Sequence, residues 1–338
     1  MRIEPEYIVE FAQRNCLTVG AAAIALAAEN RGIAWTRLGC RNCLQLSQGS
    51  LQRFLKGTIT SNTSRRAMRI AWSKRRTIEI LFARGLPVPV QEVVHSAEEA
   101  AAAARRMGYP IVVKPVRGNH GRGISVAVLT EKEVVVAFIR AAKHCAHVLV
   151  GNYVPGNDHR ILVANGVFVA AVRRIPGHII GNGSDRIATL IENVNRDPLR
   201  GIGHENVLTR IMLDEEAERM LKIRGYTFDS VPHRDEVVFL RSYANTSAGG
   251  TSIDVTDSVH PDNKMLAEVA VNLIGLDIGG VDFITSDISK SHREVGGAIC
   301  EVNAGPGLRL HLSPTEGMPR DVASPIVDML FSRDPFFP

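Results

Sequence analysis

The spacing of apolar and polar residues predicts short strands that alternate with helices along most of the chain. The clearest stretch lies in the first half, where capping hydroxyl residues start helices over 96–107 and 130–144. Short runs rich in β-branched residues at 111–115 and 124–129 lie between these helices and are typical of strands. This mixture predicts an α/β (α+β) fold.

The same signals place the remaining elements. The run from Arg160 to Arg173 predicts a hairpin, because Asn165-Gly166 at its centre is a favoured tight-turn pair. Further helices are expected over 19–31, 61–81, 214–224, 263–274 and 322–331. Further strands are expected near 35–38, 44–47, 54–60, 147–150, 236–240, 280–285 and 298–303.

These elements divide the chain into two parts. Residues 1–72 predict a small N-terminal α/β segment, and residues 73–338 predict the main domain. Within the main domain, about 109–150 would form a flap subdomain around a glycine-rich loop. The stretch from about 176 to 234 is polar and rich in glycine, so we expect it to be an insertion on the surface.

Composition and charge narrow the class of partner. The net charge is only +5, and the basic residues are scattered and lack interleaved aromatic residues. This pattern favours a small anionic ligand such as a nucleotide over a nucleic acid. The apolar run from Val19 to Ala28 is too short to span a bilayer, so we expect no membrane partner and a cytoplasmic protein.

The chain has 5 cysteines, of which Cys40 and Cys43 form a C-x-x-C pair. Such a pair can bind zinc or perform redox chemistry, but no second pair follows at metal-ligand spacing. Ordinary reduced thiols are the favoured interpretation.

A glycine loop provides the first candidate chemistry. Gly118, Gly121 and Gly123 would let backbone N–H groups approach a phosphate, with Lys114 and Arg122 supplying positive charge. A P-loop or a Rossmann loop would open a helix, whereas a strand follows here. The loop therefore joins two strands and could cover phosphates as a flap, although an ordinary glycine-rich hairpin stays open.

Acidic residues in two apolar strands provide the second candidate. Glu301 and Asn303 lie two positions apart and share one face of a strand, and Asp282 on a neighbouring strand could complete an oxygen site for Mg²⁺. Exposed strand ends, or a carboxylate satisfied by a nearby arginine, are the alternatives. Arg309 and Arg241 could stabilise a transferred phosphate or a substrate carboxylate, with surface salt bridges as the alternative.

Together these residues resemble the ATP-grasp superfamily and, more narrowly, the ATP-grasp domain of cyanophycin synthetases. The resemblance extends from about Ala25 to Phe331. The segments that carry it are Ser73-Lys74, 113–115, 118–123, 200–205, Leu240-Arg241, 245–257, 301–307 and 328–331.

The resemblance implies an ATP-grasp fold with a nucleotide held between two α/β lobes, and it implies ATP and two Mg²⁺ ions as cofactors. Lys74 and Lys114 would hold ATP phosphates, and Asp158 would bind the ribose. The residues implied to cover the phosphates are Gly118, His120, Gly121, Arg122 and Gly123. Those implied to bind Mg²⁺ are Asp282, Glu301 and Asn303, and those implied to serve the acyl phosphate or the substrate are Arg241, Arg309 and Asn245.

The implied activity is an ATP-dependent ligation of an amino-acid or peptide carboxylate to the amine of an amino acid. Gly151 stands where the family usually carries a glutamate beside the adenine, so an inactive nucleotide-binding regulator stays open. The chain ends at Pro338 without the Mur-ligase-like domain of cyanophycin synthetase, so we expect a single step such as Asp addition. A glutamate- or glutathione-type ligase and a homo-oligomer also stay open.

Overall fold

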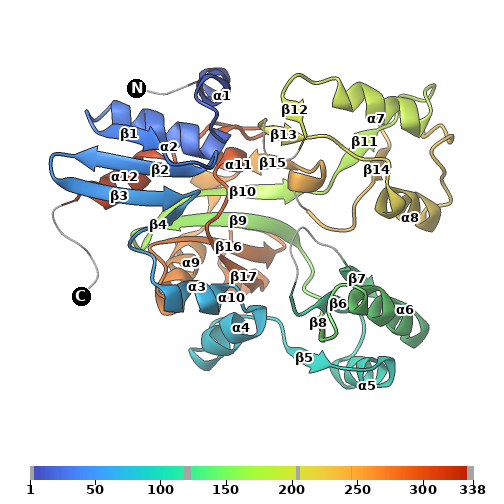
Figure 1. Ribbon diagram of the computed structural model, residues 1–338. Helices are drawn as coiled ribbons and strands as arrows, with labels where there is room; N and C mark the ends of the chain where they lie inside the picture. The colour runs from blue at the N-terminus through green and yellow to red at the C-terminus, as the bar shows by residue number, and fades with distance from the viewer. Residues whose placement is uncertain (1–3, 118–122, 203–205, 245, 333–338) are drawn as a thin grey trace.

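The computed structural model describes residues 4–117, 123–202, 206–244 and 246–332. The predicted site residues Gly118, His120, Gly121, Arg122 and Asn245 lie outside these ranges. The described chain folds into a mixed α/β structure with several sheets, as predicted (Figure 1).

A five-stranded sheet with the order β15-β10-β9-β16-β17 forms the centre of the molecule. Neighbouring strands are antiparallel, and the β9–β10 turn lies at Asn165-Gly166, where both residues have positive φ. Alternate residues of β9, β16 and β17 pack against helix α9. The bounds are β9 Asn157–Ala164, β10 Val167–Ile175, β15 Thr251–Asp254, α9 Pro261–Ile274, β16 Ile278–Thr285 and β17 Ala298–Ala304.

A four-stranded sheet with the order β5-β8-β6-β7 forms the flap subdomain, and α5 and α6 cover one of its faces. Ser96 and Thr130 cap these two helices, as predicted. The subdomain begins before residue 109, because β5 and α5 belong to it. The bounds are β5 Gln91–Val94, α5 Ala97–Met107, β6 Ile111–Pro115, β7 Ser125–Val128, α6 Glu131–Ala142 and β8 Val148–Asn152.

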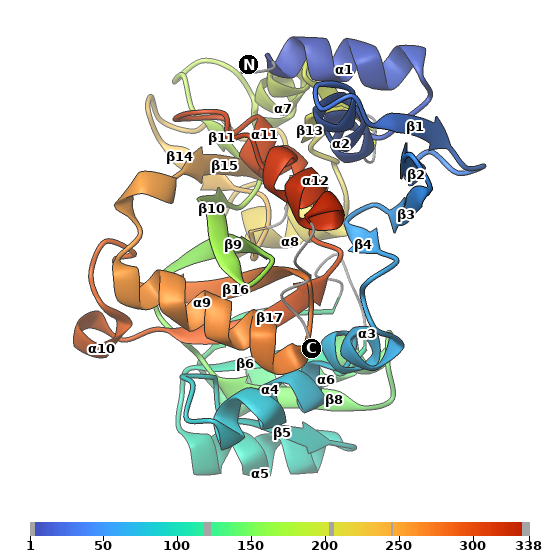
Figure 2. The same cartoon turned by 90° about the vertical axis from the view of Figure 1, so that its left-hand side faces the viewer.

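The N-terminal segment carries its own four-stranded sheet, β1-β2-β3-β4. Its helix α2 shares a hydrophobic core with α12 and with part of the central sheet (Figure 2). Arg31 pairs with Asp328 across 297 positions of sequence at 2.6 Å, so this segment is joined to the main domain. The bounds are α1 Pro5–Arg14, α2 Val19–Glu29, β1 Ala34–Arg37, β2 Cys43–Gln48, β3 Leu51–Lys56, β4 Ile59–Thr60 and α12 Ser324–Phe331.

The predicted insertion forms a separate lobe with its own small core. It extends beyond residue 234, because β11 pairs with β14 in a two-stranded sheet. The bounds are β11 His178–Ile180, α7 Ile187–Asn195, β12 Arg200–Gly201, β13 Leu208–Thr209, α8 Glu215–Ile223 and β14 Val237–Phe239.

Several expectations need correction. The helix expected over 61–81 is two helices, α3 Arg65–Ala71 and α4 Lys74–Ala83, because Ser73 caps a new start. Strand β15 occupies part of the loop expected at 245–256, and α1 and α7 were not predicted. Cys40 and Cys43 form a disulfide, so the expectation of reduced thiols is wrong for this pair. Four further short elements are α10 His292–Val295, α11 Arg309–Leu312 and the 3₁₀ turns Thr246–Ala248 and Thr256–Ser258.

Among the described residues, no single helix has the length and apolar character needed to cross a membrane. Helices α1 and α2 reach that length and composition only as a pair, with a bend of 98° between them.

Candidate active site

A cavity of about 360 Å³ lies between the flap sheet and the central sheet, and we call it the inter-sheet cavity. Lys114 on β6 and Lys74 at the start of α4 line it together with Glu301 on β17. Asp158 on β9 and Arg174 on β10 complete its charged wall. Lys114 and Glu301, predicted from opposite halves of the chain, therefore line one cavity.

Strand register explains why these charges share one face of the central sheet. Asp158 lies opposite Arg174, and Asp282 lies opposite both Arg160 and Glu301. Residues directly opposite each other in antiparallel strands project to the same face. The intervening residues project to the other face, where they pack against α9. One face of the sheet is thus apolar, and the other carries the site.

Two arginines neutralise two of the acids on this face. Nε of Arg160 donates to Oδ1 of Asp282 at 2.5 Å, and Nη2 of Arg174 lies 3.0 Å from Oδ2 of the same carboxylate. Nη2 of Arg174 also donates to Oδ1 of Asp158 at 2.5 Å. Burial acts to raise the pKa of Asp282, but the two arginines outweigh it and hold that pKa below its usual range.

Asp158 responds differently to the same surroundings. Burial raises its pKa, and the nearby Asp282 carboxylate adds to the rise against the opposing effect of Arg174. The four side chains of Asp158, Arg160, Arg174 and Asp282 therefore form one buried network with balanced charge, whose members respond to one another.

Lys114 lies buried at the other side of the cavity. Burial lowers its pKa, with a further lowering effect from the ammonium group of Lys74. Within the described residues, Lys114 forms no ion pair. An anion entering the cavity would supply the missing counter-charge, so phosphate oxygens suit this position.

The predicted metal ligands Asp282, Glu301 and Asn303 share this sheet face, and of the three only Glu301 lines the inter-sheet cavity. Asp282, Glu301 and Asn303 offer carboxylate and amide oxygens, the donors that Mg²⁺ prefers. The amide nitrogen of Asn303 donates to the Gly280 carbonyl at 3.4 Å, which leaves the amide oxygen available as a metal ligand. The described residues hold no group of three or more His, Cys, Asp or Glu placed to bind a metal. In the structure, the Asp282 carboxylate is paired with Arg160 and Arg174, which is the alternative to metal binding that the sequence had left open.

Arg241 and Arg309 lie elsewhere, because neither lines the inter-sheet cavity. Arg241 is buried and pairs with Asp214 at 2.9 Å, so it is not part of an exposed surface salt bridge. Arg309 donates to the Asn206 carbonyl at 3.0 Å and to the Thr209 hydroxyl at 3.1 Å. Burial lowers its pKa to about 10. Arg309 thus connects α11 to the inserted lobe, whereas the partners of Arg241 belong to the inserted lobe itself. The roles of both arginines toward a substrate stay predictions.

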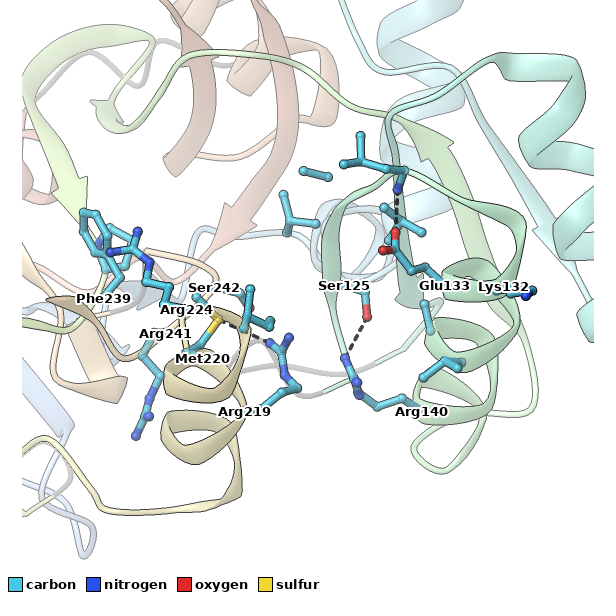
Figure 3. Close-up of a pocket in the computed structure, with 18 residues that line it drawn as sticks. Ser125, Lys132, Glu133, Arg140, Arg219, Met220, Arg224, Phe239, Arg241 and Ser242 are labelled. Atoms are coloured by element: carbon cyan, nitrogen blue, oxygen red, sulfur yellow. Dashed lines mark hydrogen bonds between the residues drawn. The ribbon is translucent and has the colours of Figure 1, made fainter. Parts of the chain in front are cut away.

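A second cavity of about 780 Å³ lies between β7 and α6 of the flap subdomain and α8 and β14 of the inserted lobe. We call it the helix-lined trough, and Figure 3 shows the side chains on its two walls. Three residues line both cavities, so the two are adjacent: Val126, Pro176 and Ser242.

The polar side chains of the trough come mainly from its helices. Arg140 on α6 donates to the Ser125 hydroxyl at 3.1 Å, and Arg219 on α8 faces it across the trough (Figure 3). Two hydrogen bonds of 2.6 and 3.0 Å join Arg219 to Glu216. Burial lowers the pKa of Arg140, and the positive charge of Arg219 lowers it further. The trough therefore presents excess positive charge between apolar walls.

Sequence reasoning missed Arg160 and Arg174. Each lies at the end of the apolar run of its strand, and a charge beside such a run is close to the signal that had identified Asp282 and Glu301. Asp158 and Arg160 also lie two positions apart, which places them on one strand face. The signal was present, but the pairing between strands was not visible in the sequence.

The family model of the RimK-like ATP-grasp domain matches residues 71–182. Cyanophycin synthetase of Trichormus variabilis is 44% identical over 313 residues, which cover 92% of this chain and 35% of that protein. The glutathione biosynthesis bifunctional protein GshAB of Clostridium perfringens is 31% identical over 344 residues, which cover 98% of this chain and 44% of that protein.

Among solved structures, the bifunctional glutathione synthetase from Pasteurella multocida matches with a TM-score of 0.69 and 29% identity. That match covers 94% of this chain and 44% of the other. The chain thus spans less than half the length of these relatives. The family and the fold predicted from the sequence motifs are confirmed: this protein contains a RimK-like ATP-grasp domain and belongs to the ATP-grasp superfamily.

Proposed function

We propose that this protein is an ATP-dependent carboxylate–amine ligase. In the first step, a carboxylate oxygen of the substrate attacks the γ-phosphorus of ATP, and the bond to the β-phosphate oxygen breaks to release ADP. In the second step, an amine nitrogen attacks the acyl carbon, inorganic phosphate leaves with the C–O electron pair, and the amine loses a proton. The products are an amide, ADP and phosphate.

The observation that carries this proposal is that Lys114 and Glu301 line one cavity. Lys114 and Lys74 supply positive charge for the phosphates from the flap side and from α4. Glu301 lies on the opposite wall with Asp158 and Arg174. Cations fixed before the reaction stabilise the charge that develops on a transferring phosphoryl group without needing to reorganise.

Asp282, Glu301 and Asn303 are the residues that would hold Mg²⁺, which would neutralise charge on the phosphates when bound. Since Asp282 is paired with Arg160 and Arg174, we expect nucleotide binding to draw Arg174 toward the phosphates and free one carboxylate oxygen. Gly123 is the described end of the predicted flap loop, and a Cβ there would lie 2.7 Å from the His144 side chain. Only glycine suits this turn without displacing His144.

The helix-lined trough supports a proposal about the substrate. It adjoins the inter-sheet cavity, its walls are largely apolar, and Arg140 projects into it without a described acidic partner. A peptide or amino acid with an acidic group suits such a surface, because its carboxylate would pair with the guanidinium. We therefore propose that the acidic substrate approaches the phosphates through the trough.

The test is a phosphate-release screen in which the full chain is given Mg-ATP with amino acids and short peptides, singly and in pairs. A ligase should release phosphate only when a carboxylate substrate and an amine substrate are both present, and mass spectrometry should detect the amide. Nucleotide binding without turnover across the panel would favour the regulatory alternative. Turnover with γ-glutamyl dipeptides and glycine, and not with aspartate, would favour the glutathione-type alternative.

A further inference from the structure

The part of the inter-sheet cavity away from the lysines carries a neutral polar group, the side-chain amide of Gln91. On the flap sheet, Gln91 of β5 lies opposite Gly151 of β8, and Gly151 lies opposite Val112 of β6. Opposed residues project to one face, and all three line the inter-sheet cavity. A row across three strands therefore faces the ligand, with the Gln91 amide as its polar side chain.

Gly151 leaves room for the close approach of the chain at Val90 and Gln91. A Cβ at position 151 would lie 3.0 Å from the Val90 carbonyl oxygen and 3.3 Å from the Cβ of Gln91. Both distances are tighter than most real Cβ contacts, and one partner is rigid backbone. A side chain at 151 would require a small shift of the neighbouring chain at Val90 and Gln91. Within this row of three residues, the polar side chain therefore comes from β5.

The row formed by Gln91, Gly151 and Val112 lies a short way along the strands from Lys114. Val112 precedes Lys114 by two positions on β6, which corresponds to about 7 Å along a strand. Lys74, Lys114 and Glu301 form the charged part of the cavity, and the row of Gln91 adds no charge. A nucleotide with its phosphates on the lysines would place its base toward the neutral row.

We propose that Gln91 contacts the nucleobase and lets this site accept both 6-amino and 6-oxo purine nucleotides; this inference rests on the proposed function. Within the described residues, the Gln91 amide makes no hydrogen bond, although the side chain is half-buried in the cavity wall. A primary amide can turn to offer either its oxygen or its NH₂ group. It therefore accepts from a 6-amino purine in one orientation and donates to a 6-oxo purine in the other. A carboxylate at position 91 would only accept hydrogen bonds and could not donate one.

The test compares the dissociation constants of ATP and ITP, each with Mg²⁺, for the full chain and three variants. Because one hydrogen bond to a neutral group contributes about 1 kcal/mol, wild type should bind the two nucleotides within about tenfold of each other. Gln91→Glu should widen the preference for ATP by about tenfold or more, and Gln91→Leu should weaken both nucleotides with little change in their ratio.

Glu92→Gln serves as the matched control, because Glu92 is the next residue of β5 and pairs with the exposed Arg106. It should leave both affinities unchanged. An unchanged ATP-to-ITP ratio in Gln91→Glu, with nucleotide binding intact, would overturn this inference and leave the ligase proposal standing. If wild type bound neither nucleotide, or if Lys114→Ala left binding unaffected, the proposed function itself would fail and this inference with it.

Discussion

The inter-sheet cavity and the helix-lined trough lie side by side, yet they hold their charged groups in different ways. In the inter-sheet cavity most of the charges lie on strands, and the register of β9 with β10 and β16 fixes Asp158 and Arg174 in one network with the neighbouring Asp282. In the trough, Arg140 and Arg219 project from helices of two separate lobes. The comparison suggests that strands hold the groups for phosphate chemistry, while the helices can vary with the substrate.

The largest expected effect is the loss of turnover when a charged residue of the inter-sheet cavity is replaced. Lys114→Ala and Glu301→Gln should each lower turnover by at least about a hundredfold. The first removes a cation that stabilises the transferring phosphoryl group, and the second removes a carboxylate that would hold Mg²⁺. The measurement is phosphate release at saturating ATP. Lys56→Ala and Glu79→Gln, both at exposed positions, are the matched controls. Near-normal activity in Glu301→Gln would contradict its assignment to metal and phosphate chemistry.

Two buried histidines, His159 on β9 and His311 on α11, test whether the packing around the central sheet depends on neutral side chains. Burial lowers the pKa of His159 to about 4 and that of His311 to about 3. The unfolded chain binds these protons near pH 6.5, so stability is complete above that pH and falls as the pH drops toward 4. Each histidine should cost about 2 kcal/mol of unfolding free energy between pH 8 and pH 5.

Chemical denaturation at both pH values checks this expectation. His159→Gln should reduce the loss between pH 8 and pH 5 by about 2 kcal/mol, whatever its effect on stability at pH 8. The exposed His233→Gln should leave the loss unchanged. Equal pH dependence in all three proteins would show that His159 does not titrate as its burial implies.

A smaller effect is expected in the trough. Arg140→Ala should raise the KM for an acidic substrate by about tenfold and change kcat by less than about twofold, because binding in the trough precedes phosphoryl transfer. Steady-state kinetics with the substrate from the phosphate-release screen provide the measurement. Lys143→Ala, at the exposed end of the same helix, is the control. A fall in kcat with KM unchanged would place Arg140 in the chemistry and remove the distinction between the cavities.

The smallest effect concerns charges that belong to neither cavity. Arg106 and Glu92 pair at 2.7 Å, but 58% and 45% of their side chains stay exposed. Exposed pairs of this kind contribute at most about 1 kcal/mol. Arg106→Ala should therefore change the free energy of unfolding by less than about 1 kcal/mol, with no change in turnover. Thermal unfolding and the phosphate assay measure both, and a clear loss of turnover would show that the outer face of the flap also matters.

The sequence predicted the local features of this fold well. Ser96, Thr130 and the Asn165-Gly166 turn act through near neighbours, so they could be recognised from short stretches. The convergence of Lys114 and Glu301 was expected from the family resemblance. The pairing of Asp282 with Arg160 and Arg174 was not, because it depends on the register of strands more than 100 positions apart. The proposed role of Gln91 could not be seen either, because strand β5 was not predicted from the sequence.

The shared core of α2 and α12 has a consequence for synthesis of the chain. The alanine-rich helix α2 leaves the ribosome early, but its partner helix and Asp328 follow much later. At roughly 5–20 residues per second, the 297 positions between Arg31 and Asp328 take on the order of 15–60 s to translate. During that interval α1, β1 and β2 cover part of this largely apolar helix, and the face that later packs on α12 is open to a nascent-chain chaperone.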